Sequence, residues 1–105
     1  MLTSLFLAAA LHTPKPPAVM ATRPNLRVAL VTGWIDQGFS SRLEQLLASN
    51  PQVAYVQIES PGGLASQAYE AAEVINRRRI EIRVLGRCAS ACGILRVKRR
   101  VPVAR

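Results

Sequence analysis

The sequence of 105 residues contains few of the side chains that support metal binding, disulfide frameworks or base stacking. It has one histidine, two cysteines, one tryptophan, two tyrosines and two phenylalanines. Two cysteines are too few for a disulfide framework, and their spacing does not suggest a metal site. No apolar run is long enough to span a bilayer. The length allows at most one domain, and half of the residues are apolar, which suffices for a core.

Acidic residues are also scarce, with six against 14 lysines and arginines, which gives a net charge of +8. The excess is concentrated between Arg77 and Arg105, where ten basic residues accompany a single acid, Glu81. Such a segment can meet nucleic acid or an anionic membrane surface, and the alternative is a solvated tail. No aromatic residue lies within the basic run, so a stacking platform is absent and nucleic-acid binding is not favoured.

Residues 1–24 are expected to form a leader outside the folded part. The apolar run Leu2–Leu11 resembles the core of a signal peptide, with Ala8–Ala10 as a cleavage site. This predicts export to the periplasm, or association with a membrane through the apolar segment; the alternative is a cytoplasmic protein. The stretch from His12 to Pro24 holds four prolines and is interpreted as a linker.

Hydrophobic patterning predicts alternating strands and helices. Apolar, β-branched runs predict three strands, at Leu26–Thr32, Val53–Ile58 and Ile80–Leu85. Three helices are expected to follow them, one from Ser41 to about Ser49, one from Leu64 to the triplet Arg77–Arg79, and one starting near Ser90. Short loops and helical crossovers predict an α/β fold with a parallel sheet, whose middle strand is apolar enough to be covered on both faces.

Two turns lie where such a sheet collects its ligands, at the carboxyl ends of adjacent strands. One is Ser60–Gly63 and the other is Arg87–Ser90. In the first, a proline followed by two glycines can leave a backbone N–H uncovered by any side chain, as an oxyanion hole requires. In the second, Ser90 lies at a strand-to-helix turn, and the N–H of Ala91 offers another donor. Taken singly, each turn has an ordinary explanation. The first can be a common proline–glycine turn, and Ser90 in the second can be a helix N-cap.

Together, the two turns carry a family resemblance. The segments Gln57–Gly63 (QIESPGG) and Gly86–Gly93 (GRCASACG), with the strand Ile80–Leu85 between them, resemble the Clp protease proteolytic-subunit family of the crotonase-like superfamily. The serine between two cysteines is most similar to an exported, uncharacterised bacterial branch of that family. The resemblance extends from about Leu26 to Leu95.

This resemblance implies a β-α-β spiral fold and a serine peptidase site. Ser90 matches the nucleophile, and Gly63 and Ala91 match the residues whose N–H groups form the oxyanion hole. Cys88 and Cys92 match cysteines of the exported branch, where a disulfide would brace the turn. It also implies a peptide or protein substrate, assembly into homo-oligomers, and no metal or cofactor.

The sequence departs from the family after Cys92. The family's histidine and aspartate follow the serine, but the segment 93–105 contains neither a histidine nor an acid. Beyond Leu95 the expected apolar helix is replaced by basic residues and Pro102. We therefore interpret residues 25–95 as a core fragment and 96–105 as a basic tail, as in a truncated or frameshifted member. Because serine is a poor nucleophile without a base, we do not expect the chain as given to catalyse.

Two other functions fit parts of the sequence. A crotonase-type acyl-CoA protein shares the pair of oxyanion donors but uses carboxylates, and Glu59 is the only acid near either turn. A non-enzymatic protein could instead dock its basic end on nucleic acid or a membrane surface. Neither alternative requires Ser90.

Overall fold

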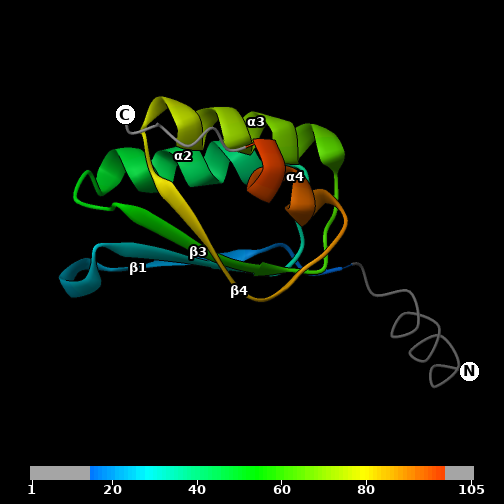
Figure 1. The fold of residues 1–105 in the computed structure, drawn as a ribbon, viewed down its shortest axis with the longest axis horizontal. Coiled ribbons are helices and arrows are strands. Elements are labelled where there is room, and N and C mark those ends of the chain that lie inside the picture. The colour runs from blue at the N-terminus through cyan, green and yellow to red at the C-terminus, as the bar shows by residue number, and fades with distance from the viewer. Residues whose placement is uncertain (1–14, 99–105) are drawn as a thin grey trace, which may run out of the picture.

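The computed structural model describes residues 15–98, which form one α/β unit. The strands are β1 (Val19–Arg23), β2 (Val28–Thr32), β3 (Tyr55–Ser60) and β4 (Glu81–Cys88). The helices are the 3-10 turn η1 (Pro24–Leu26), then α2 (Phe39–Ser49), α3 (Ala65–Arg77) and α4 (Ala91–Lys98). Figure 1 shows α2, α3 and α4 gathered on one side of the sheet. The predicted alternation of strands and helices from β2 onwards is confirmed.

The sheet is mixed rather than wholly parallel, which corrects the prediction. Its order is β1-β2-β3-β4, with β2, β3 and β4 parallel and β1 antiparallel to β2. Strand β1 lies inside the stretch interpreted as a linker. The hairpin forms because η1 reverses the chain and Arg27 takes a positive φ of 56°, which brings Val19 opposite Thr32. The high proline content of this stretch predicted a linker, and the short apolar segment between the prolines was not recognised as a strand.

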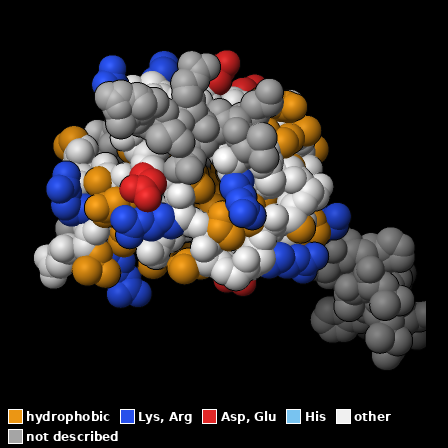
Figure 2. Space-filling model, viewed as in Figure 1, with side chains coloured by type: hydrophobic (Ala, Val, Ile, Leu, Met, Phe, Trp, Pro, Cys, Tyr) orange, Lys and Arg blue, Asp and Glu red, His pale blue; other side chains and the backbone are white. Residues whose placement is uncertain are grey.

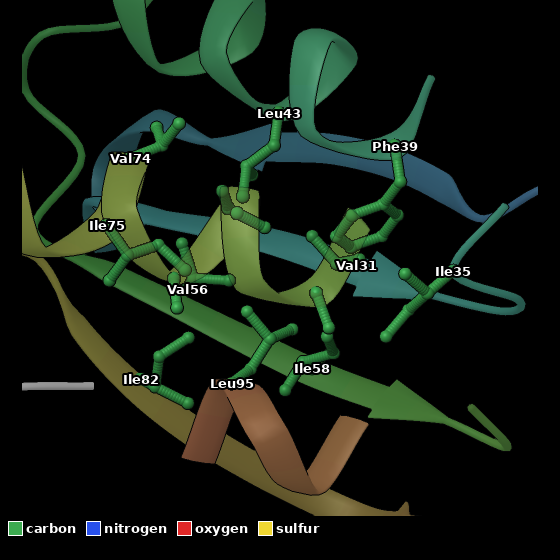
Figure 3. Close-up of a cluster of buried hydrophobic side chains, with 14 of the residues drawn as sticks. Val31, Ile35, Phe39, Leu43, Val56, Ile58, Val74, Ile75, Ile82 and Leu95 are labelled. Atoms are coloured by element: carbon green, nitrogen blue, oxygen red, sulfur yellow. The ribbon is translucent and has the colours of Figure 1, made fainter. Parts of the chain in front are cut away.

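The core lies between the sheet and the three helices (Figure 3). Phe39 and Leu43 of α2 and Ile75 of α3 point towards the strands. The strands contribute buried residues at alternate positions, as expected when one face is covered: Ala29, Val31, Val56, Ile58 and Ile82. From α4, Leu95 joins the same cluster. The helix α4 is thereby held to α3 and to the sheet.

The opposite face of the sheet carries no helix among residues 15–98, so the expectation that β3 is covered on both faces is wrong for this part of the chain. Val19 is 70% exposed there. Tyr55 and Gln57 of β3 are half-buried. The guanidinium of Arg83 lies 3.7 Å from the centroid of the Tyr55 ring, which covers part of this surface. The apolar run therefore predicted the strand β3 correctly, but it did not predict how many faces of the sheet are covered by helices.

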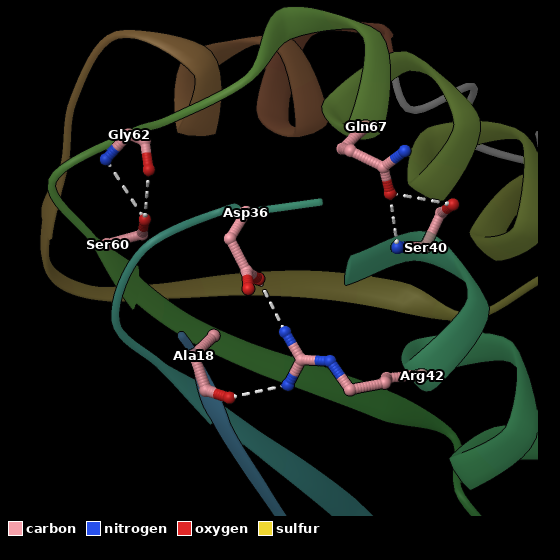
Figure 4. A network of polar contacts seen from close by, with 7 residues as sticks. All are labelled: Ala18, Asp36, Ser40, Arg42, Ser60, Gly62 and Gln67. Carbon is pink, nitrogen blue, oxygen red and sulfur yellow. Dashed lines mark hydrogen bonds and ion pairs between the residues drawn. The ribbon is translucent and has the colours of Figure 1, made fainter. Parts of the chain in front are cut away.

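Helix α2 begins two residues earlier than predicted, at Phe39, and its N-cap is Gly38 instead of Ser41. The buried side chain of Gln67 on α3 takes over the capping role. Its Oε1 accepts hydrogen bonds from the backbone N–H and the hydroxyl of Ser40, at 2.9 and 3.1 Å (Figure 4). Because the acceptor comes from 27 residues away, local capping patterns could not reveal it.

Several expectations fall wholly or partly outside the described residues. The signal-like segment, with its cleavage site, and His12 lie within residues 1–14, and the last seven residues of the predicted tail lie within 99–105. The predicted boundary between core and tail, after Leu95, falls inside α4, which continues to Lys98. Within residues 15–98, no helix has the length and apolar character needed to cross a membrane.

Candidate functional site

The two turns singled out in the sequence meet at the carboxyl ends of β3 and β4. The backbone N–H of Ala89 donates to the carbonyl of Ser60 across 3.0 Å. Gly62 lies against Ser90, since a Cβ atom on Gly62 would come 3.2 Å from the Ser90 Oγ. The parallel pairing of the two strands brings the turns together, so their predicted meeting is confirmed.

The first turn is held from both sides. Ser60 is fully buried, and its Oγ accepts a hydrogen bond from the N–H of Gly62 at 3.0 Å (Figure 4). On the other side, the N–H of Ile35 donates to the carbonyl of Gly62 and the N–H of Leu64 donates to the carbonyl of Ile35, both at 2.8 Å. A Cβ on Gly63 would lie 2.1 Å from the Ile35 carbonyl oxygen, so only glycine fits there.

The second turn presents the serine in a rare conformation. Ser90 is exposed and has φ of 54°, in the left-handed region that residues with a Cβ seldom occupy. It stands one residue before helix α4, in which the N–H groups of Cys92 and Gly93 already bond to the Ala89 and Ser90 carbonyls. The Ser90 hydroxyl itself forms no hydrogen bond within residues 15–98. Backbone strain of this kind is found mainly at functional sites. It persists only where the surrounding structure holds the residue in place.

Two backbone donors beside the serine remain without an acceptor in the described part of the chain. They are the N–H of Gly63 and the N–H of Ala91. The bridge between Gly63 and Ile35 is made by the carbonyl of Gly62 and the N–H of Leu64, so it does not use the N–H of Gly63. Ala91 is the first residue of α4, where the N–H has no carbonyl one turn earlier to bond to. These are the two groups that the family resemblance assigns as oxyanion donors.

A disulfide joins Cys88 to Cys92 across the serine turn, as the family resemblance implied. Cys88 ends β4, and Cys92 is fully buried in α4. The bond therefore ties the last residue of the strand to the first turn of the helix. Ala89, Ser90 and Ala91 span the closed loop, so the conformation of Ser90 is constrained by a covalent link as well as by packing.

A bulge in β4, which the sequence analysis missed, aims the serine turn at the first turn. Ile58 pairs with Val84, and the next pair is Ser60 with Cys88. One residue of β3 is therefore opposed by three of β4, including Gly86 at φ of 70°. Bulges bend a strand and redirect the residues after it. The glycine within a strand pattern was the available signal.

Within residues 15–98, no charged side chain forms a hydrogen bond with Ser90. No histidine occurs within residues 15–98. Asp36 forms an ion pair with Arg42, which also donates to the Ala18 carbonyl and so holds β1 to α2 (Figure 4). Glu59 is exposed, with its carboxylate beside Gly86. No cluster of three potential metal ligands occurs in the part of the chain that the structure describes.

Basic side chains are dispersed over the visible surface. On the face seen in Figure 2, Lys and Arg side chains are separated by hydrophobic and uncharged ones. Among the described residues, Arg77 pairs with Glu44 at 3.0 Å and Arg83 pairs with Glu81 at 3.5 Å. This face therefore offers no continuous basic surface.

Comparison with protein-family models finds no match to this chain, and comparison with curated proteins finds none either. The fold and the geometry of the two turns must therefore carry the functional argument.

Proposed function

We propose that this chain carries the nucleophile and the oxyanion-binding half of a serine acyl-transfer site of the Clp-protease type. Ser90 is the nucleophile, and the N–H groups of Gly63 and Ala91 bind the oxyanion. The substrate is a peptide or protein acyl group. The observation that carries the proposal is the contact between Gly62 and Ser90, because it places the exposed hydroxyl of a strained turn against the turn that contains Gly63.

The arrangement suits the chemistry of acyl transfer. The Ser90 Oγ adds to a carbonyl carbon, the carbonyl oxygen takes the electron pair, and the two N–H groups donate to the resulting oxyanion. Collapse of the tetrahedral intermediate expels the leaving group and leaves an acyl-serine. The proton of the hydroxyl must pass to a base, and no imidazole within residues 15–98 can accept it. The half-site therefore stabilises the intermediate but does not activate the serine at neutral pH.

An activated ester at alkaline pH tests this half-site, since hydroxide then removes the serine proton and p-nitrophenolate leaves readily. The protein is treated with p-nitrophenyl acetate, and acetylation of each serine is followed by peptide mass spectrometry. We expect Ser90 to react at least about ten-fold faster than Ser49, because the proposed oxyanion donors lie at the two turns and not at Ser49. Ser49 is an exposed serine at the C-terminal end of α2 and serves as an internal control. Equal rates of acetylation at the two serines would contradict the proposed oxyanion site.

A further inference from the structure

The only two cysteines of the sequence close a short ring, residues 88–92, around the proposed nucleophile. The ring runs from Cys88 at the end of β4 to Cys92 in the first turn of α4, and Ser90 lies at its centre. The proposed donor Ala91 lies inside the same ring. One covalent bond therefore encloses the hydroxyl and one of the two N–H groups that the proposed half-site uses.

The ring holds a strained conformation at its centre. Ser90 has φ of 54°, a left-handed value that is unfavourable for a residue with a Cβ. The strain of such a residue and the stabilisation that a short disulfide loop supplies are of the same order. Breaking the bond therefore removes a contribution large enough to change the conformation of Ser90, and the direction of the Ala91 N–H changes with it.

The elements on either side of the ring have other contacts that hold them. Ala91, Cys92 and Leu95 are buried, and α4 packs on α3 and β4. On the strand side, the N–H of Ala89 donates to the carbonyl of Ser60 at 3.0 Å. Opening the ring is therefore expected to loosen the turn while β4 and α4 stay docked, as a local switch requires.

The two cysteines differ in their access to solvent. Cys92 is fully buried, whereas Cys88 is half-buried. Cys88 also ends an edge strand, because β4 has β3 as its one neighbour in the described sheet. A thiolate from solvent therefore reaches the disulfide through Cys88, and Cys92 is the leaving group.

We infer that the Cys88–Cys92 disulfide is a redox switch that sets the reactivity of Ser90. This inference rests on the proposed function. With the bond formed, Ser90 and the Ala91 N–H are held in the reactive arrangement. With the bond reduced by a dithiol, the turn relaxes and Ser90 reacts like an ordinary exposed serine.

The exchange transfers two electrons from the dithiol to the protein. One thiolate of the dithiol attacks the Cys88 sulfur, the bond to Cys92 breaks, and Cys92 leaves as a thiolate that takes up a proton. The second thiolate of the dithiol then displaces the Cys88 sulfur from the mixed disulfide, and this sulfur is protonated in turn. The protein gains two thiols, and the reductant ends as its own disulfide.

The redox state and the reactivity of Ser90 are measured on the same samples. The full chain is equilibrated with mixtures of reduced and oxidised dithiothreitol, and free thiols are blocked with iodoacetamide, because thiolates would consume the ester. Peptide mass spectrometry gives the reduced fraction, and p-nitrophenyl acetate gives the rate of acetylation of Ser90 relative to Ser49. We expect this ratio to fall at least about five-fold on reduction, and to recover when an unblocked sample is reoxidised.

The Cys88→Ala, Cys92→Ala double variant separates loss of the bond from the bulk of the blocked thiols. It should show the low ratio in every dithiothreitol mixture, and far-ultraviolet circular dichroism checks that it and the reduced wild type stay folded. Global unfolding of the wild type on reduction, or reduction only in denaturing urea, would show a structural cross-link and overturn the switch.

Failure of the switch and failure of the proposed function give different results. If the oxidised protein acetylates Ser90 no faster than Ser49, the proposed function is rejected and the switch with it. If the oxidised and the reduced protein are equally selective for Ser90, the proposed function stands and the switch alone is rejected.

Discussion

Gly62 and Ser90 lie so close that a Cβ atom on Gly62 would come within 2.7 Å of the Cβ of Ser90. A helix and a strand separate them along the sequence, yet their turns behave as one structural unit. Ser60 holds one turn from inside, and the disulfide of Cys92 holds the other. Each part of this unit can be altered separately.

Gly62→Ala should disturb both turns at once. Gly62 has φ of 117°, and the added Cβ would also lie 2.9 Å from the Ala89 carbonyl oxygen. We expect a loss of about 1–3 kcal/mol in the free energy of unfolding, measured in urea, from backbone strain and overpacking. Selective acetylation of Ser90 should fall with it.

The matched control for this substitution is Gly93→Ala. Gly93 lies in α4, and apart from its chain neighbours and its own helical backbone no atom of residues 15–98 lies within 4 Å of the position that an alanine methyl would take. This variant should gain about 0.5–1 kcal/mol, because alanine is favoured over glycine inside a helix. A destabilisation as large as that of Gly62→Ala would show that α4 tolerates no change, and the contact with Ser90 would then not explain the loss at Gly62.

Ser60→Ala tests the buried hydroxyl beneath the first turn. The change leaves the Gly62 N–H buried without its acceptor, which costs about 1–3 kcal/mol of unfolding free energy. Ser66→Ala, on the exposed side of α3, should change stability by less than about 0.5 kcal/mol. Equal urea midpoints for the two variants would indicate that the Ser60 hydroxyl does not support the turn.

Loss of the disulfide should loosen the serine turn. Cys88 and Cys92 are four positions apart, and closing so short a loop contributes about 2 kcal/mol in the chain-entropy view. We expect the Cys88→Ala, Cys92→Ala double variant to unfold at lower urea and to exchange amide hydrogens faster around Ser90. Reductant should shift the wild type in the same direction and leave the double variant unchanged. Unaltered exchange in the wild type on reduction would contradict the bracing role.

Arg42→Met should release β1 from α2. The Arg42 guanidinium bonds to the Ala18 carbonyl at 2.8 Å and pairs with Asp36, both partly buried. We expect a loss of about 1 kcal/mol and faster amide exchange in β1. Arg77→Met removes an exposed pair with Glu44, and should cost no more than about 0.5 kcal/mol. If β1 exchanges at the same rate in both variants, Arg42 does not secure the edge of the sheet.

A fluorophosphonate probe should not label Ser90 appreciably at neutral pH. The reason is chemical, since labelling needs a deprotonated hydroxyl and the described residues include no imidazole to accept the proton. Gel fluorescence of the labelled full chain, with Ser90→Ala beside it, measures this. Strong labelling that disappears in Ser90→Ala would mean that a base reaches the site, and the chain would then be an active hydrolase.

Local patterns were informative where the relevant interaction is local. The strands β2, β3 and β4, the helix α3 and the two turns follow from apolar periodicity and from proline and glycine, whose effects act within a few residues. The start of α2 did not follow, because Gln67 caps it from another helix. Ala91 was predicted as a donor from the turn chemistry and Gly63 was assigned by the family resemblance, but the burial and hydrogen bonding of Ser60 were not predicted.

The order of residues by itself determined the alternation of strands and helices, the positions of the turns and the placing of a serine between two cysteines, because backbone sterics and hydrophobic spacing act along the chain. Tertiary structure alone decided that β1 pairs antiparallel, that the helices cover one face, and that β4 bulges towards Ser60. It also decided which N–H groups near Ser90 have no acceptor within residues 15–98. Pairing between distant segments gives some backbone N–H groups an acceptor and leaves others without one, and no local sequence pattern reveals which.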